Sequence, residues 1–69
     1  MTVMLYTKPD CPYCDAARRY LDEREVAYEE RDITTDPAAE EEVAAITGGP
    51  LTVPITVEGG EVRVGFPYT

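Results

Sequence analysis

The sequence predicts a small α/β domain with elements in the order β-α-β-α-β-β and a four-stranded mixed sheet. Two amphipathic stretches with helix start signals alternate with short apolar runs along the first 50 residues. Two β-branched runs then follow, separated by Gly59-Gly60. The chain has 69 residues, about half the usual domain length, so we expect residues 1–69 to form a single domain.

The first strand and the first helix are expected to meet near residue 10. Val3 to Tyr6 is a short apolar run that stops before Lys8-Pro9-Asp10, as a buried strand followed by a turn does. A helix is expected from Pro12 to about Arg24. Its core face is given by a spacing of i, i+3 and i+7, namely Cys14, Ala17 and Leu21. The opposite face is charged, and we expect Asp15 and Arg19 to pair there in solvent.

A second strand and a second helix are expected between residues 26 and 48. Val26-Ala27-Tyr28 opens the strand, but Glu29 to Asp32 are charged, which indicates a half-buried strand at a sheet edge. Asp36 is the expected N-cap of the helix, with Pro37 at its first position. Its buried stripe is Ala39, Val43 and Ile46. Gly48 follows as a helix end signal.

The last two strands form a predicted hairpin. Pro54 to Glu58 and Glu61 to Val64 are both rich in β-branched residues and alternate in polarity. Only Gly59-Gly60 separates them, which is typical of a two-residue hairpin turn. The five residues after Val64 are too few for another helix.

Composition excludes several classes of function. Asp and Glu number 14 against 6 Lys and Arg, and the net charge of -8 disfavours nucleic acid and anionic membrane surfaces as partners. No apolar run reaches the roughly 20 residues that a membrane span requires. The chain lacks His and Ser, so a Ser-His-Asp triad and a Cys-His pair are excluded. The first residues resemble no secretory signal, and we expect a cytoplasmic protein.

Chemistry is expected at Cys11-Pro12-Tyr13-Cys14. Cysteines at i and i+3 of a helix start have Cα atoms about 5 Å apart, within disulfide range. Cys11 would face unpaired backbone amides and the positive helix end, which stabilise a thiolate, so it is the expected nucleophile. Cys14, one turn further on the apolar face, is the expected resolving thiol. A structural disulfide and a metal or iron-sulfur site remain the alternatives.

The chain resembles the glutaredoxins of the thioredoxin-fold superfamily. The resemblance rests on Tyr6-Thr7-Lys8-Pro9-Asp10-Cys11-Pro12-Tyr13-Cys14, on Thr52-Val53-Pro54 and on Gly65, and it covers nearly the whole chain. It implies a minimal thioredoxin-like fold and a cis peptide between Val53 and Pro54 facing the dithiol.

The resemblance also implies which residues bind substrate. The Val53 backbone would pair with a substrate or with glutathione as an added strand, and Lys8 and Tyr13 would contact glutathione. The implied substrate-binding residues are Lys8, Pro12, Tyr13, Val53, Pro54 and Gly65. No metal and no tightly bound cofactor are expected, and glutathione would serve as a co-substrate.

Two features depart from the glutaredoxin pattern. Glutaredoxins carry an acidic residue after Gly-Gly near the end, whereas this chain has Gly65-Phe66-Pro67, closer to redoxins that serve ribonucleotide reductase and take electrons from thioredoxin reductase. We expect the family's final helix, which lies beside the first helix, to be absent or truncated. We therefore hypothesise that a second copy covers the exposed apolar residues in a homodimer.

The sequence as a whole predicts a thiol-disulfide oxidoreductase that reduces protein or small-molecule disulfides. Its electrons would come from glutathione or from thioredoxin reductase, and a ribonucleotide reductase is one candidate target. The resemblance implies roles in electron transport and cell redox homeostasis. The alternative is a non-catalytic iron-sulfur or metal-binding module that uses Cys11 across a dimer.

Overall fold

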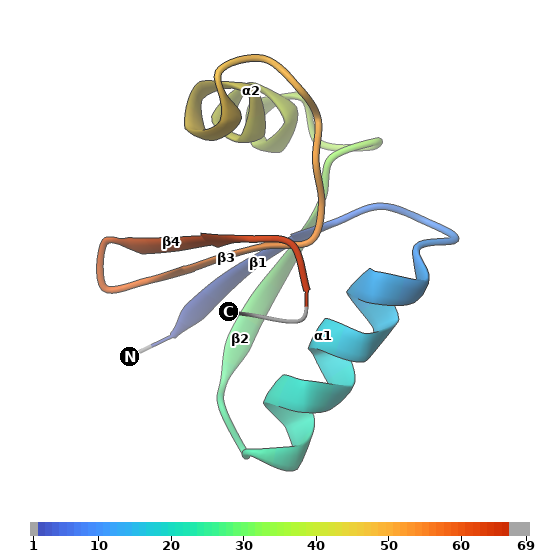
Figure 1. Ribbon diagram of the computed structural model, residues 1–69, viewed down its shortest axis with the longest axis vertical. Coiled ribbons are helices and arrows are strands. Elements are labelled where there is room, and N and C mark those ends of the chain that lie inside the picture. Colours follow the sequence, from blue (N-terminus) through green and yellow to red (C-terminus); the bar gives the residue numbers. More distant parts are fainter. Residues whose placement is uncertain (1, 67–69) are drawn as a thin grey trace.

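Two helices lie on opposite faces of a four-stranded sheet (Figure 1). The computed structural model describes residues 2–66. The elements are β1 (Val3–Thr7), α1 (Pro12–Glu23), β2 (Tyr28–Asp32), α2 (Pro37–Thr47), β3 (Ile55–Glu58) and β4 (Glu61–Val64). This is the predicted order of elements. The predicted end of the chain, from Pro67 to Thr69, lies outside the described residues.

The sheet has the strand order β2-β1-β3-β4 and is mixed, as predicted. β1 pairs in parallel with β2 and antiparallel with β3, and β3 pairs antiparallel with β4. The charged strand β2 therefore lies at an edge, as its sequence indicated. Because β1 and β3 run in opposite directions, the carboxyl end of β1 and the amino end of β3 lie at the same end of the sheet.

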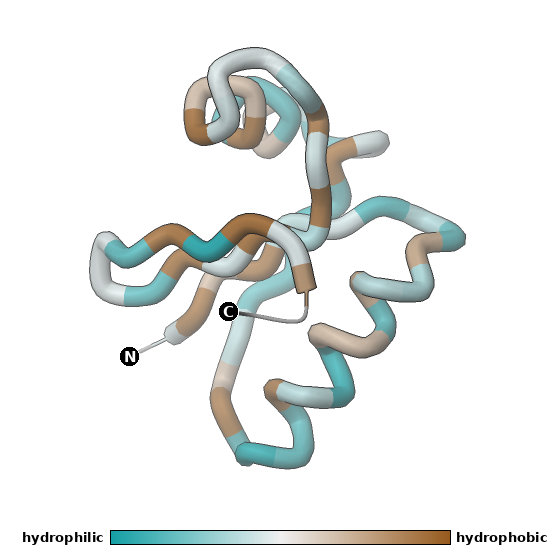
Figure 2. The backbone as a smooth tube through the Cα atoms, in the orientation of Figure 1, coloured by the Kyte–Doolittle hydropathy of each residue, from teal (hydrophilic) through white to brown (hydrophobic). Residues whose placement is uncertain are grey.

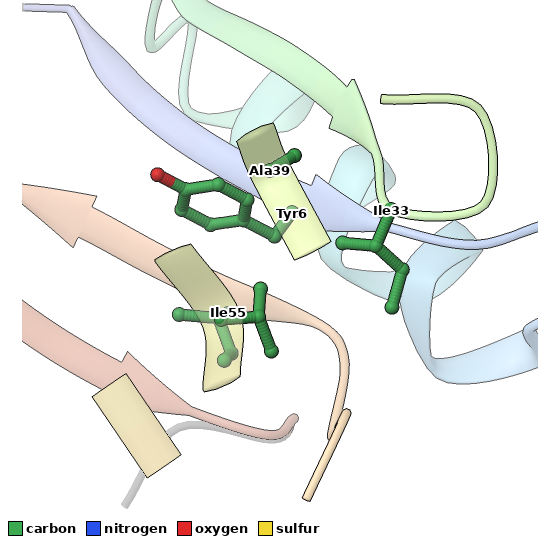
Figure 3. Close-up of a cluster of buried hydrophobic side chains, with 5 residues drawn as sticks. Tyr6, Ile33, Ala39 and Ile55 are labelled. Carbon is green, nitrogen blue, oxygen red and sulfur yellow. The ribbon is translucent and has the colours of Figure 1, made fainter. Parts of the chain in front are cut away.

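The register of the strands divides the core into two clusters. Residues of β1 alternate between the faces, so Val3 and Leu5 pack against Ala17 and Leu21 of α1. Tyr6 points to the other face, where Figure 3 shows it with Ile33, Ala39 and Ile55. Leu5 and Ile55 are wholly buried, and such a side chain contributes about 1.5–3 kcal/mol to stability.

Helix α1 buries the predicted face, since Cys14, Ala17 and Leu21 are its buried residues. The predicted pair of Asp15 and Arg19 on the solvent face is wrong, because Arg18 instead contacts Asp15 at i, i+3. Arg18 also reaches across to Glu30 of β2, which lies beside α1 and offers both carboxylate oxygens. Because Arg18 can bind the Glu30 carboxylate as well, Asp15 pairs with Arg18 and not with Arg19.

Helix α2 begins and ends at the predicted residues. The Asp36 carboxylate accepts hydrogen bonds from the amides of Ala38 and Ala39, and Gly48 ends the helix at a φ of 83°. Ala39 and Val43 are buried, whereas Ile46 is only half-buried. Arg31 of β2 binds Asp36, which fastens the edge strand to this helix.

Two strands start later than the sequence indicated. β2 begins at Tyr28 because the amide of Val26 is used at the end of α1, where it donates to the Leu21 carbonyl over 3.0 Å. β3 begins at Ile55 because Pro54 has no N–H to donate to the sheet. The hairpin turn is as predicted, with Gly59 and Gly60 at φ of 55° and 85°.

Strand β4 alternates between hydrophobic and hydrophilic residues, which Figure 2 shows along the hairpin. Val62 and Val64 pair with Val57 and Ile55, so both valines lie on the α2 face of the sheet. Their exposed fractions are 43% and 52%. Among the helices of residues 2–66, none combines the length and apolar character that crossing a bilayer takes.

Candidate dithiol active site

Cys11 lies at the entrance of α1, as predicted. The turn after β1 places Asp10 at a φ of 57°, a left-handed conformation that Asp tolerates better than most residues. Cys11 then adopts extended backbone as the N-cap of α1. Its sulfur accepts a hydrogen bond from the Cys14 amide over 3.2 Å. The sulfur thus takes the position that a capping oxygen normally occupies.

Cys14 lies one turn into α1 and is fully buried, whereas Cys11 is 6% exposed. Both thiols are free. Burial raises the pKa of Cys14 to about 12, with a further contribution from its hydrogen bond to Cys11. The Lys8 backbone amide and the charge of Arg18 act in the opposite direction. Cys14 is therefore a protonated thiol behind a more accessible neighbour, as its place on the apolar face indicated.

Val53 and Pro54 lie at the same end of the sheet as the dithiol. The turn that carries Cys11 leaves the carboxyl end of β1, and Pro54 precedes β3 directly, at the amino end of that strand (Figure 1). The peptide bond between Val53 and Pro54 is cis, as the resemblance implied. Pro54 is buried and Val53 is partly buried against the α2 cluster.

Gly65 is joined to this proline. Its amide donates a 2.7 Å hydrogen bond to the Pro54 carbonyl oxygen, with Gly65 at a φ of 84°. The bond closes the end of β4 against the segment that precedes β3. Three of the predicted binding residues, Val53, Pro54 and Gly65, are thus brought together by the fold.

The other predicted binding residues lie on the surface around the helix start. Tyr13 is 62% exposed, and Lys8 and Pro12 are also exposed. An exposed tyrosine ring between two cysteines offers apolar area to a partner that approaches Cys11. The Lys8 backbone also lowers the pKa of Cys14, an effect that the sequence did not predict.

A polar network beside the dithiol was missed in the sequence. Thr7, the last residue of β1, donates a 2.9 Å hydrogen bond to Glu30, which also binds Arg18. Arg18 lies at i+4 from Cys14, a spacing that was visible along the helix. The sequence alone could not place Glu30 in this network, because its position depends on the parallel register of β1 and β2, in which it pairs with Leu5.

A hollow of about 190 Å³ opens between α1 and the hairpin. Leu21 of α1 and Val3 of β1 line its apolar side, but the hairpin side is polar, with Thr56, Glu58 and Arg63. This is the side on which a helix next to α1 would lie. The dimer hypothesis places a second copy of the chain over this hollow, and this placement stays a prediction.

Within residues 2–66, no group of three or more Cys, Asp or Glu side chains is arranged to hold a metal ion. Cys11 and Cys14 are two sulfur ligands at one helix start, and a tetrahedral site requires four.

Solved structures place this arrangement among the thioredoxin-like proteins. The chain superposes on the thioredoxin-like protein BC3987 with a TM-score of 0.84 and 38% identity, covering 93% of this chain and 86% of that one. The family model of the glutaredoxins matches residues 3–63, so the chain belongs to the glutaredoxin family.

Two further relatives mark the range of similarity within this family. Glutaredoxin 1 of Rickettsia conorii is 43% identical over 54 residues, which are 77% of this chain but 53% of that protein. The chain thus spans about half the length of that relative. NrdH-redoxin from Escherichia coli, described as a glutaredoxin-like protein with a thioredoxin-like activity profile, has a TM-score of 0.81 and 29% identity, covering 96% of this chain and 84% of that one.

Proposed function

We propose that the protein is a dithiol-disulfide oxidoreductase in which Cys11 is the nucleophile and Cys14 the resolving thiol. The proposal is carried by one observation: the Cys11 sulfur caps α1 and accepts the Cys14 amide proton, while Cys14 is buried behind it. Backbone amides at a helix start favour negative charge on a sulfur placed there. The cysteine nearer the surface is therefore the one prepared to attack.

The reaction transfers two electrons in two exchanges. The Cys11 thiolate attacks one sulfur of a disulfide, forms a mixed disulfide and releases the first thiolate, which takes a proton from solvent. Cys14 then loses its proton to solvent and attacks the Cys11 sulfur. The second thiolate leaves, and the protein is left with a Cys11-Cys14 disulfide while the substrate disulfide is fully reduced.

The segment around the cis-proline is the proposed substrate site. The backbone of Val53 would pair with an extended substrate as an added strand, in the manner of β-augmentation. Tyr13 would supply apolar contact on the other side, and the Lys8 ammonium would attract a carboxylate of glutathione or of a peptide. Pro54 and Gly65 hold the segment in place through their 2.7 Å hydrogen bond.

The electron source is part of the proposal. Glutathione and thioredoxin reductase are both candidate donors, and the structural likeness to NrdH-redoxin, with its thioredoxin-like activity profile, supports the reductase. Disulfide-containing proteins are the proposed targets, with ribonucleotide reductase as one to test. A cytoplasmic location is the setting in which this chemistry is expected.

The test is NADPH consumption with a small disulfide substrate in two arms. One arm contains glutathione and glutathione reductase, and the other contains thioredoxin reductase. Turnover that requires Cys11 in either arm supports the oxidoreductase, and the active arm identifies the donor. Inactivity in both arms, with visible absorption in anaerobically purified protein, would instead support an iron-sulfur module that uses Cys11.

A further inference from the structure

Arg18 is the arginine whose position relative to the dithiol is fixed by the fold. Its guanidinium binds Glu30 through two hydrogen bonds, Nε to Oε1 at 2.8 Å and Nη2 to Oε2 at 2.6 Å, and it also contacts Asp15. Two parallel hydrogen bonds hold a planar guanidinium in one orientation. The Arg18 side chain is 28% exposed, so its charge is partly shielded from water.

Glu30 is itself held by β1. The hydroxyl of Thr7 donates to Glu30 Oε2 over 2.9 Å, and Thr7 is only 1% exposed. Thr7 and Cys11 are joined by a short turn, so the network begins next to the dithiol. The chain of contacts runs from β1 through β2 to α1, and it returns to the helix one turn after Cys14.

Arg18 lies at i+4 from Cys14, where two side chains of a helix are neighbours. The charged groups that bear on Cys14 and on Arg18 come from two elements. Arg18 of α1 is the charged side chain that acts on Cys14, beside its N-cap neighbour Cys11. Asp15 of α1 and Glu30 of β2 pair with Arg18. The Arg18 charge lowers the pKa of Cys14, against burial, and it is the cation whose place the network fixes.

We propose that Arg18, anchored by Glu30 and Thr7, is a positioning residue that favours the Cys14 thiolate in the step that resolves the mixed disulfide. The proposal rests on the dithiol exchange proposed above. In that step the Cys14 sulfur loses its proton to solvent, forms a bond to the Cys11 sulfur and expels the bound thiolate. A fixed positive charge one turn away stabilises the sulfur as it becomes negative.

Glu30 limits this effect as well as fixing its geometry. Its carboxylate keeps Arg18 in place, but its negative charge lies on the same side of the dithiol. The arrangement therefore predicts that changes at Arg18 and at Glu30 have different consequences. Loss of Arg18 leaves the Glu30 charge without its counter-charge, whereas loss of the Glu30 charge leaves the arginine.

The experiment is stopped-flow reaction of the reduced protein with dithiobis(nitrobenzoate). Attack by Cys11 releases one thionitrobenzoate, and attack by Cys14 on the mixed disulfide releases the second. The two phases are measured from pH 5 to pH 9, and the second reports resolution alone. The variants are Arg18→Gln, Arg18→Lys and Glu30→Gln, with Arg19→Gln on the exposed face as the matched control.

We expect Arg18→Gln to slow the second phase roughly three- to tenfold at neutral pH and to displace its pH profile upward, with a smaller change in the first phase. Arg18→Lys restores most of the rate because it keeps the charge. Glu30→Gln is at least as fast as wild type, and Arg19→Gln equals wild type. Thermal unfolding of each variant confirms that it is folded at the assay temperature.

Two results would overturn the inference: a second phase in Arg18→Gln equal to wild type in rate and pH profile, or equal losses in Arg18→Gln and Arg18→Lys. A wild-type protein that never releases the second thionitrobenzoate contradicts the proposed dithiol function instead. The two failures are therefore distinct.

Discussion

The amide of Gly65 and the carbonyl oxygen of Pro54 are joined by a 2.7 Å hydrogen bond that closes the end of β4 against the segment before β3. The bond depends on a left-handed backbone at Gly65, where φ is 84°. A glycine at this position therefore serves the fold and the proposed substrate segment together.

Replacing Gly65 with Ala should lower the free energy of unfolding by about 1–2 kcal/mol, since a side chain disfavours this conformation. An added Cβ would meet no atom within 4 Å, so the cost is conformational rather than steric. Gly65→Asn should lose less, because Asn enters the left-handed region more readily. Urea unfolding of the three proteins gives the order, and equal stability of Gly65→Ala and wild type would contradict it.

Replacing Cys14 with Ser should trap the mixed disulfide on Cys11. The first exchange needs only Cys11, whereas release of the bound thiolate needs the second sulfur. Intact-mass spectrometry after exposure to a disulfide substrate should show one adduct per chain. Cys11→Ser is the matched control and should carry no adduct at neutral pH, because Cys14 is buried and its pKa is raised to about 12. The opposite labelling pattern would reverse the two roles.

The reduced protein should lose stability at alkaline pH through Cys14. Burial raises its pKa from 9.0 to about 12, so the unfolded chain releases this proton first. The stabilisation is complete below pH 9 and is lost as the pH rises towards about 12. Urea unfolding at successive pH values should show a decline that is shallower in Cys14→Ala. An equal decline of the free energy of unfolding with pH in both proteins would show that Cys14 is not the cause.

Glu30 should contribute stability that disappears in acid. Hydrogen bonds from Arg18 hold the pKa of Glu30 below its usual value, so the folded state favours the charged carboxylate. The contribution is present above the pKa of the unfolded chain and is lost as the pH falls through the lower folded pKa. Glu30→Gln should cost about 0.5–1 kcal/mol at pH 7, a value suited to a partly exposed pair. The difference from wild type should vanish in acid, and a difference independent of pH would point to lost packing instead.

Leu5 should be among the most sensitive core positions. It is wholly buried between α1 and the sheet, and Leu5→Ala should cost about 2–5 kcal/mol, a large part of the stability of a small domain. Leu51→Ala makes the same chemical change at a residue that is 45% exposed, and its effect should be well under 1 kcal/mol. Similar losses at both positions would contradict the assignment of the core.

Local signals account for the parts of the fold that the sequence predicted. Asp36-Pro37 begins a helix and Gly59-Gly60 turns a hairpin by their own backbone preferences, which need no distant partner. The position of Cys11 at a helix start was predictable for the same reason. The cis bond before Pro54 was expected only through the family resemblance, since most bonds before proline are trans.

The contacts of Arg18 could not be predicted in this way. By helix spacing alone, Arg19 is as plausible a partner for Asp15 as Arg18 is. Arg18 is favoured by the position of Glu30 in the folded structure, because Arg18 binds both carboxylates. That placement depends on β2 lying parallel to β1 in a register that pairs Glu30 with Leu5. Contacts that join elements distant in sequence carry no local pattern, which is why the network beside the dithiol emerged only from the structure.

The acidic composition of β2 affects how readily the protein aggregates at high concentration. Within residues 2–66, β2 pairs with β1 alone, so its other edge faces no strand, and Glu29, Glu30 and Asp32 lie along it. A second copy aligned along it would bring carboxylates within about 5 Å of one another. At neutral pH, repulsion between these carboxylates disfavours edge-to-edge pairing of β2 strands from two molecules. Acidification protonates the carboxylates and removes this repulsion. Concentrated samples should accordingly aggregate most slowly in mildly alkaline, low-salt buffer, where the carboxylates are charged and least screened.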